Sequence, residues 1–160
     1  MAFIAYKQDG PPALVAITGP RIEVTAPQVF RVMDVLFPHA SDIRLISGLA
    51  QGVDTHGIHW ATRRGAGVIA VGIDDSLDGS DPYTAPKRRN QRMVDLKPFL
   101  CVGFPGHGGT NDMMDRCLKA GVIVWEVAFT DQDGFEVWQW PSPSEPQARM
   151  IAAGSFKPRT

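Results

Sequence analysis

The segment Phe104–Asp112 contains the residue types best suited to holding an anion. Its glycines allow consecutive backbone N–H groups to point into one concavity, and the helix expected to begin at Thr110 adds the partial positive charge of its N-terminus. Phosphate is therefore the expected ligand, and Thr110 could both cap the helix and contact that ligand. The ligand-binding residues expected in this segment are Gly106, His107, Gly108, Gly109 and Thr110.

Asp112 is the candidate catalytic carboxylate that follows this loop. It could act as a general base or stabilise positive charge on a ribose, as carboxylates do in sugar hydrolysis. An acidic residue in the first turn of a helix also interacts favourably with the helix dipole without any catalytic role. Both interpretations fit the sequence.

Two further clusters of small and polar residues follow apolar runs. In Thr18–Arg21 the glycine permits close approach of a ligand to the backbone, and Arg21 is either a fork for phosphate or carboxylate or a solvated arginine in a turn. In Ser47–Asp54 the small residues leave room for a bulky ligand group, and Asp54 either hydrogen-bonds ribose hydroxyls or caps the next helix. The expected ligand-binding residues here are Thr18, Gly19, Arg21, Ser47, Gly48, Gly52 and Asp54.

A basic segment, Lys87–Arg92, carries the strongest local positive charge. Arg89 and Arg92 are three residues apart on an expected helix, hence on one face, which suits pairing with phosphate oxygens. Such a run of charges can also be a solvated helix face. We expect Arg89 or Arg21 to be the counter-charge to phosphate, and Arg89 to orient the phosphate if the protein is a hydrolase.

Apolar runs rich in β-branched residues predict buried parallel strands, because each is too short for a typical helix. They are Ala13–Ile17, Ile43–Ile46, Gly67–Ile73, Phe99–Phe104 and Val122–Val127. Helical patterns lie between them: one opens at Thr25 with a capping box to Gln28, and others begin near Asp54, Asn90 and Thr110. Strands that alternate with helices predict βαβ units in a parallel sheet.

The expected fold class is α/β: a Rossmann-like three-layer fold with a mostly parallel sheet of about five strands plus an edge strand. The edge strand is expected at Phe135–Trp140, and Phe3–Tyr6 could be a second, short one. Residues 1–140 would form a single nucleotide-binding domain, and the proline-rich tail, residues 141–160, would be an irregular wrap or partly disordered. The polar clusters then lie at the carboxyl ends of strands, where open parallel sheets bind ligands.

Composition narrows the classes of partner. A net charge of −1 gives no overall field for DNA, RNA or an anionic membrane, so any polyanion site must be local. Cys101 and Cys117 are expected to be buried, apolar and reduced. Neither a signal peptide nor a membrane-spanning run is evident, so we expect a cytoplasmic protein with no membrane partner.

No metal or other cofactor is expected. His56 and His59 could share a metal ion, but the sequence offers no obvious third ligand. The chain also has neither the glycine-rich loop of P-loop nucleotide hydrolases nor the nucleophile elbow of α/β-hydrolases.

Four motifs, taken in order, resemble the motif series of the SLOG superfamily: Ile17–Arg21, Ser47–Asp54, Arg89–Met93 and Phe104–Thr110. That superfamily joins the lonely-guy phosphoribohydrolases to the Rossmann-like part of DNA-processing protein A and to small bacterial and phage proteins of the YspA-like type. The last group is the most similar in length. The resemblance implies that Asn90 binds the ligand beside Arg89, and that Arg89 and Asp112 are the catalytic candidates.

The resemblance implies two competing functions. The lonely-guy enzymes cleave the N-glycosidic bond of a nucleoside monophosphate with a Pro-Gly-Gly-x-Gly-Thr-x-x-Glu loop. Here His107 replaces the second glycine and Met113 stands at the glutamate position, with Asp112 one residue earlier. One residue on a helix rotates a side chain by about 100°, so the catalytic carboxylate does not carry over directly.

The other implied function, from Ser47–Asp54 and residues 70–74, is single-stranded DNA binding of the DNA-processing protein A type. The sequence shows no run of aromatics for base stacking, which such binders use. The leading interpretation is a protein that binds a nucleoside monophosphate or an NAD- or ADP-ribose-like molecule, as a sensor, a sequestering protein or an N-glycosidic hydrolase. By analogy, the edge with Trp138 and Trp140 could form a homo-oligomer.

Overall fold

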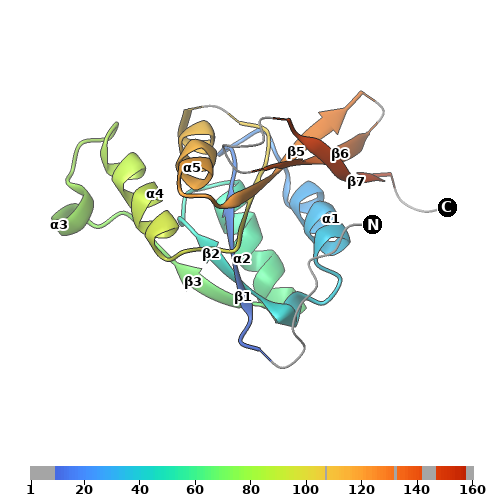
Figure 1. The fold of residues 1–160 in the computed structure, drawn as a ribbon, viewed down its shortest axis with the longest axis horizontal. Coiled ribbons are helices and arrows are strands. Elements are labelled where there is room, and N and C mark those ends of the chain that lie inside the picture. Colours follow the sequence, from blue (N-terminus) through green and yellow to red (C-terminus); the bar gives the residue numbers. More distant parts are fainter. Residues whose placement is uncertain (1–9, 107, 132, 142–146, 158–160) are drawn as a thin grey trace.

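The computed structural model describes residues 10–106, 108–131, 133–141 and 147–157. Its strands are β1 (Ala13–Thr18), β2 (Ile43–Ser47), β3 (Gly67–Ala70), β4 (Leu100–Gly103), β5 (Ile123–Thr130), β6 (Gly134–Trp140) and β7 (Arg149–Ser155). Within the described residues they form one sheet of 7 strands in the order β3-β2-β1-β4-β5-β6-β7 (Figure 1). The strands from β1 to β5 pair in parallel, and β6 and β7 are antiparallel additions.

The helices are α1 (Ala26–Leu36), α2 (Val53–Arg64), α3 (Asp75–Asp78), α4 (Ala85–Asp95) and α5 (Gly108–Lys119), with a short 3-10 turn, η1 (Ala40–Asp42). The predicted capping box begins α1: Gln28 N donates to Thr25 Oγ1 and Thr25 N donates to Gln28 Oε1. Gly65, in the left-handed region at φ 82°, ends α2 as expected. The helix expected near Asn90 begins earlier, at Ala85, because Pro86 fits the first turn of a helix.

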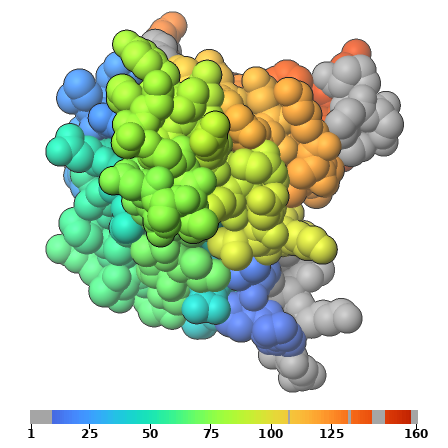
Figure 2. Space-filling model, turned by 90° about the vertical axis from the view of Figure 1, so that its left-hand side faces the viewer, coloured from blue at the N-terminus to red at the C-terminus, as the bar shows by residue number. Residues whose placement is uncertain are grey.

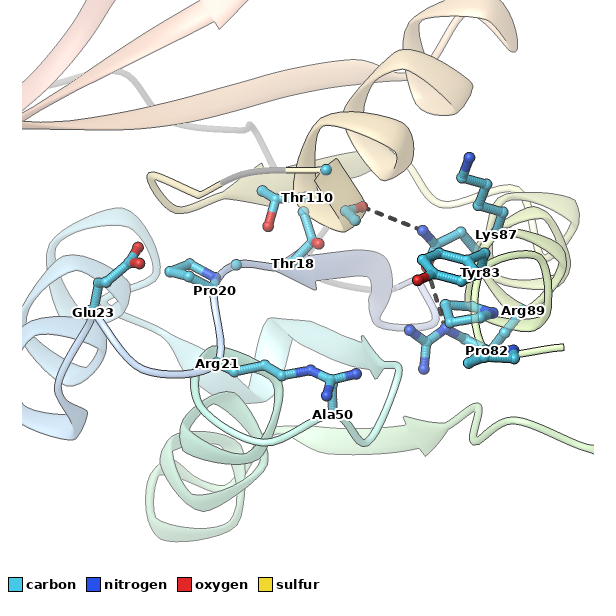
Figure 3. A pocket seen from close by; sticks show the side chains of 15 residues that line it. Thr18, Pro20, Arg21, Glu23, Ala50, Pro82, Tyr83, Lys87, Arg89 and Thr110 are labelled. Carbon is cyan, nitrogen blue, oxygen red and sulfur yellow. Dashed lines mark hydrogen bonds between the residues drawn. The ribbon is translucent and has the colours of Figure 1, made fainter. Parts of the chain in front are cut away.

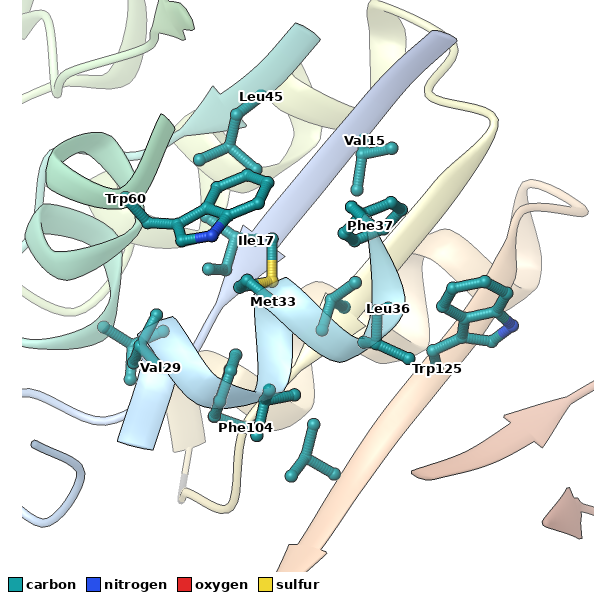
Figure 4. Close-up of a cluster of buried hydrophobic side chains, with 14 of the residues drawn as sticks. Val15, Ile17, Val29, Met33, Leu36, Phe37, Leu45, Trp60, Phe104 and Trp125 are labelled. Atoms are coloured by element: carbon teal, nitrogen blue, oxygen red, sulfur yellow. The ribbon is translucent and has the colours of Figure 1, made fainter. Parts of the chain in front are cut away.

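The helices cover both faces of the sheet, which gives the expected three layers. On one face, α1 and α2 bury the larger apolar core, where Phe37 packs between Trp60 and Trp125 at ring distances of 6.2 and 5.9 Å (Figure 4). On the other face, α4 and α5 bury a second core that includes Met93 and Met113. Within the described residues no helix is long and apolar enough to cross a membrane.

The strand order creates a switch point between β1 and β4. From β1 the chain passes through α1 to β2 on one side, whereas from β4 it passes through α5 to β5 on the other side. The loops that leave β1 and β4 therefore diverge toward opposite faces of the sheet. A crevice opens between such loops at the carboxyl ends of the strands, which is where ligands bind in doubly wound folds.

The expected edge strand, β6, is an inner strand of the sheet. It pairs with β5 on one side and with β7 on the other, so the expectation of an irregular tail was wrong over Arg149–Ser155. The strand was missed because its alanines and glycine have low β propensity and because the prolines nearby suggested a loop. The possible strand at Phe3–Tyr6 lies outside the described residues.

Two smaller expectations have clear outcomes. Cys101 and Cys117 are buried and free, as expected. The third strand is shorter than expected, because β3 ends at Ala70 and the chain then leaves the sheet as a loop toward α3. That loop leaves Ile73 half exposed beside the switch-point crevice.

The segment after β7 docks on the sheet through one aromatic ring. Phe156 lies 5.4 Å from the ring of Phe129 and 5.3 Å from that of Phe135. We expect Phe156→Ala to lower the free energy of unfolding, measured by urea denaturation, by about 2 kcal/mol, because the ring is partly buried. Met150→Ala, at a 53% exposed position on β7, should change it by less than about 0.5 kcal/mol. Equal effects of the two substitutions would contradict this docking.

Candidate functional site

A cavity of about 430 Å³ lies at the switch point, between the loops that follow β1 and β4. The loop before α4 and the first turns of α4 and α5 complete its walls (Figure 3). Its volume is in the range of small-molecule sites. The lining residues are Thr18, Gly19, Pro20, Arg21, Glu23, Ala50, Pro82, Tyr83, Pro86, Lys87, Arg89, Asn90, Gly108, Gly109 and Thr110.

The first turn of α5 forms one wall of this cavity. The helix begins at Gly108 and not at Thr110, so Thr110 is inside the helix and does not cap it. Thr110 is 4% exposed and Thr18 is 8% exposed, and Figure 3 shows both on the side of the cavity opposite Arg21. Neither hydroxyl has a hydrogen-bond partner in the described part of the chain. Buried polar groups nearly always have partners, so these two hydroxyls are available to a ligand.

The glycines of this region differ in what the fold requires of them. A Cβ on Gly106 would lie 2.7 Å from Thr110 Oγ1, and one on Gly19 would lie 2.5 Å from Val53. By contrast, a Cβ on Gly108 or Gly109 would meet no described atom within 4 Å. Both of these helical glycines line the cavity. His107 lies outside the described residues, so its expected role is not placed.

Arg89 is a buried cation on the opposite wall. Its Nη1 donates a short hydrogen bond to Gly48 O, and its Nε donates to Asn90 Oδ1 at 3.2 Å. Burial lowers the pKa of Arg89, while the negative charges of Asp54 and Asp78 raise it. Because guanidinium groups keep their proton in proteins, the cavity contains a partly desolvated positive charge.

Asn90 connects α4 with the first turn of α5. Its Nδ2 donates to Gly109 O at 3.3 Å and to Asp112 Oδ2 at 3.1 Å. Asp112 Oδ2 also accepts a hydrogen bond from Arg116 Nε at 2.8 Å. Asp112 itself does not line the cavity. Asn90, which was expected to bind the ligand, thus lines the cavity, whereas the expected catalytic carboxylate of Asp112 does not, and its Oδ2 accepts two hydrogen bonds from within the protein.

Asp54 is buried beside the cavity and not at its surface. The N-cap of α2 is Gly52, so the capping alternative for Asp54 was wrong. Its Oδ2 accepts a hydrogen bond from Ala50 N at 3.2 Å. Burial raises the pKa of Asp54 to about 6, although Arg89 and Arg21 lower it. Its carboxylate therefore balances the charge of Arg89 from within the protein.

The other residues of the Ser47–Asp54 cluster shape the loop. Ser47 Oγ donates to Asp54 O at 2.9 Å. A Cβ on Gly48 would lie 2.7 Å from Arg89 Nη1. Gly52, at φ 80°, allows close packing against the loop after β1, whose Pro20 O accepts a hydrogen bond from Val53 N at 3.2 Å. None of the predicted ligand-binding residues in this cluster lines the cavity of about 430 Å³, but Gly48 lines a smaller neighbouring one of about 210 Å³.

Arg92 does not join Arg89 at the cavity. Its Nε and Nη2 donate to the two carboxylate oxygens of Asp78 at 2.8 and 2.5 Å, and Nη2 also donates to Gly72 O at 2.7 Å. This bidentate pair fastens α3 to α4 and holds the pKa of the buried Asp78 at about 2. The expectation that Arg89 and Arg92 pair together with phosphate was wrong, because the side-chain partner of Arg92 is within the protein.

Sequence reasoning missed several lining residues. Pro82, Tyr83 and Pro86 form the wall contributed by the start of α4, and Glu23 and Ala50 complete the opposite side. For Tyr83, the sequence did offer a signal of a place in the cavity wall: a tyrosine between two prolines, in a turn before a basic helix. In the part of the chain that the structure describes, no cluster of His, Cys, Asp and Glu could hold a metal ion.

Comparisons with known proteins establish the fold. No family model and no curated protein sequence matches the chain. Among solved structures, DNA processing protein A (DprA) from Streptococcus pneumoniae superposes with a TM-score of 0.60 at 20% identity, over 76% of this chain and 52% of the DprA chain. This likeness shows a shared Rossmann-like fold. The chain thus corresponds to about half of DprA.

A second solved structure, that of PaaA, covers 78% of this chain and 43% of its own at 14% identity. Its TM-score is 0.44.

Asp54 gives the site a pH-dependent stability. Its pKa rises from 3.8 to about 6 on folding, so the folded state binds this proton more tightly and loses stability as pH rises through 6. We expect Asp54→Asn to remove that loss. The unfolding free energy of the variant minus that of the wild type should increase by roughly 2.4 kcal/mol between pH 4 and pH 7.5, measured by urea denaturation.

Asp78→Asn is the control, because the pKa of Asp78 is lowered to about 2. The stabilising effect of its charge is complete above the unfolded pKa and is lost only as pH falls toward 2. Across the same pH range, the difference between this variant and the wild type should stay nearly constant. A constant difference for Asp54→Asn as well would contradict the raised pKa of Asp54.

Proposed function

We propose that the protein binds a phosphate-bearing nucleotide or nucleotide derivative, with the phosphate against the first turn of α5. Gly108 and Gly109 carry this proposal. Glycine in a helix is less favourable than alanine by roughly 1 kcal/mol, and neither the backbone nor a described neighbour requires it at these positions. Two consecutive glycines that no described residue requires, at the N-terminus of a helix that lines a cavity, suit the close approach of an anion.

The charges of the cavity support the same ligand. Arg21, Lys87 and Arg89 line it, together with one carboxylate, that of Glu23. This local excess of positive charge contrasts with the net charge of −1 of the chain. The free hydroxyls of Thr18 and Thr110 add donors that can reach phosphate oxygens or ribose hydroxyls.

Nucleotides also match the SLOG resemblance, whose motifs supply most of the residues that meet at the cavity.

Binding as a sensor or sequestering protein fits the site better than hydrolysis. Asp112, the proposed catalytic carboxylate, would have to give up its bonds from Asn90 and Arg116 to reach a ribose. Hydrolysis therefore stays the less favoured form of the proposal.

A second candidate function is binding of single-stranded DNA. The shared fold with DprA, a DNA processing protein, favours it. Calorimetry can separate nucleotide binding from single-stranded DNA binding. The screen compares nucleoside monophosphates, NAD and ADP-ribose with short single-stranded oligonucleotides. Tight, salt-sensitive binding of oligonucleotides without binding of any mononucleotide would replace the first proposal by the second.

Two substitutions of Gly109 test the effect of this position on stability and on binding separately. Gly109→Ala should raise the free energy of unfolding by about 0.5–1 kcal/mol, because the site accepts a side chain without strain. The larger Gly109→Val should weaken nucleotide binding at least about tenfold, because its side chain occupies the anion position. Asn111→Ala, in the same turn but not lining the cavity, should leave affinity unchanged. Full affinity in Gly109→Val would refute the proposed phosphate position.

Lys87 and Arg88 form a matched pair for the electrostatic part of the proposal. Both are exposed, but only Lys87 lines the cavity. Lys87→Gln should weaken nucleotide binding roughly threefold at low salt, and the difference should shrink in high salt. Arg88→Gln removes the same formal charge and should change affinity far less. Equal losses in the two variants would show that only net charge matters.

A further inference from the structure

Tyr83 is an exposed aromatic side chain at the mouth of the candidate cavity. It is 81% exposed and yet belongs to the cavity wall, together with Pro82 and Pro86. Its ring and hydroxyl have no partner among the residues that the structure describes. Figure 2 shows the segment from α3 to α4 in light green at the surface of this face. The flat face of the ring is therefore free to contact a ligand.

The backbone that carries Tyr83 is held in place by a turn. Asp81 Oδ1 accepts hydrogen bonds from Tyr83 N at 2.8 Å and from Thr84 N at 3.1 Å. Asp81 O accepts one from Ala85 N at 2.9 Å, and the ring of Pro82 fixes a further dihedral angle. Because the position of the tyrosine is set before a ligand arrives, little backbone freedom is lost on binding.

The cavity brings Tyr83 and the helix glycines together. Gly108, Gly109 and Tyr83 all line the same space, and Figure 3 shows the tyrosine on the side formed by Lys87 and Arg89. We propose that Tyr83 is the residue on which the ligand's base stacks. This inference rests on the proposed function and specifies its ligand class as nucleoside phosphates that are bound through the face of a purine or pyrimidine. Little discrimination between bases is expected, because every base has a π-face.

The smaller neighbouring cavity is the other place where a base could lie. Leu49 and Ile73 give it apolar walls, and it shares Arg21 and Arg89 with the main cavity. It does not include the glycines of α5. A base placed there would lie in a space that the α5 glycines, the proposed phosphate position, do not line. The larger cavity, which holds both the anion wall and an aromatic ring, is therefore the better fit.

The experiment compares adenosine monophosphate and uridine monophosphate with ribose 5-phosphate, which lacks a base, by isothermal titration calorimetry. The wild type should bind both nucleotides more tightly than ribose 5-phosphate, by roughly 5- to 100-fold for one stacked base. Tyr83→Ala should remove this preference and leave the affinity for ribose 5-phosphate unchanged. Tyr83→Phe should retain the preference, because the ring and not the hydroxyl makes the contact.

Ile73→Ala is the matched control, because Ile73 is an exposed apolar residue of the neighbouring cavity. It should leave the preference for nucleotides intact. Loss of the preference in Ile73→Ala but not in Tyr83→Ala would overturn the inference and place the base in the smaller cavity. Equal wild-type affinity for nucleotides and ribose 5-phosphate would overturn base stacking alone. Failure of all three ligands to bind would overturn the inference, and failure of NAD and ADP-ribose as well would overturn the proposed function.

Discussion

The buried guanidinium of Arg89 is the interaction on which the geometry of the cavity depends. It comes from α4 and bonds to the carbonyl of Gly48 in the loop after β2, while its Nε holds the side chain of Asn90. Asn90 in turn holds the first turn of α5 through Gly109 O. One cation thus connects two elements that are distant in sequence, and it does so at the point where the strand order of the sheet opens a crevice. Burying this charge is favourable only with compensation, which Asp54 supplies from the protein side.

The glycines around the crevice fall into two groups, which differ in whether the packing of the protein leaves room for a side chain. Gly19, Gly48 and Gly52 are required because a side chain there would collide with Val53, with Arg89 or with the backbone of the loop after β1. They let three loops pack closely at the carboxyl ends of the strands. Gly108 and Gly109 meet no such constraint from the described residues. A motif search treats all of these glycines alike, whereas the structure separates those that assemble the site from those that leave space within it.

The sequence predicted the features that depend on local patterns. Continuous apolar runs located β1 to β5, and the Thr25–Gln28 box located the start of α1, because both signals lie within a few residues. It failed where a partner distant in the chain decides the outcome. Arg92 was assigned to phosphate because helix spacing placed it beside Arg89, but its partner Asp78 lies 14 positions earlier, in a short helix with no apolar periodicity. The strand β7 was missed for a similar reason, since its stability comes from pairing with β6 and not from its own composition.

Asn90 links the proposed phosphate position with the carboxylate of Asp112, the catalytic candidate expected from the sequence. Its amide group donates both to Gly109 O, at the proposed phosphate position, and to Asp112 Oδ2, so both contacts use the same nitrogen. Arg116 Nε donates to the same oxygen, Asp112 Oδ2, and Arg116 Nη1 donates to Gln91 Oε1 at 2.9 Å. The carboxylate therefore acts as part of the frame that orients Asn90 and the start of α5. A ligand held as proposed against the start of α5 would leave both hydrogen bonds to Asp112 Oδ2 intact, whereas the proposed catalytic role of Asp112 would break them.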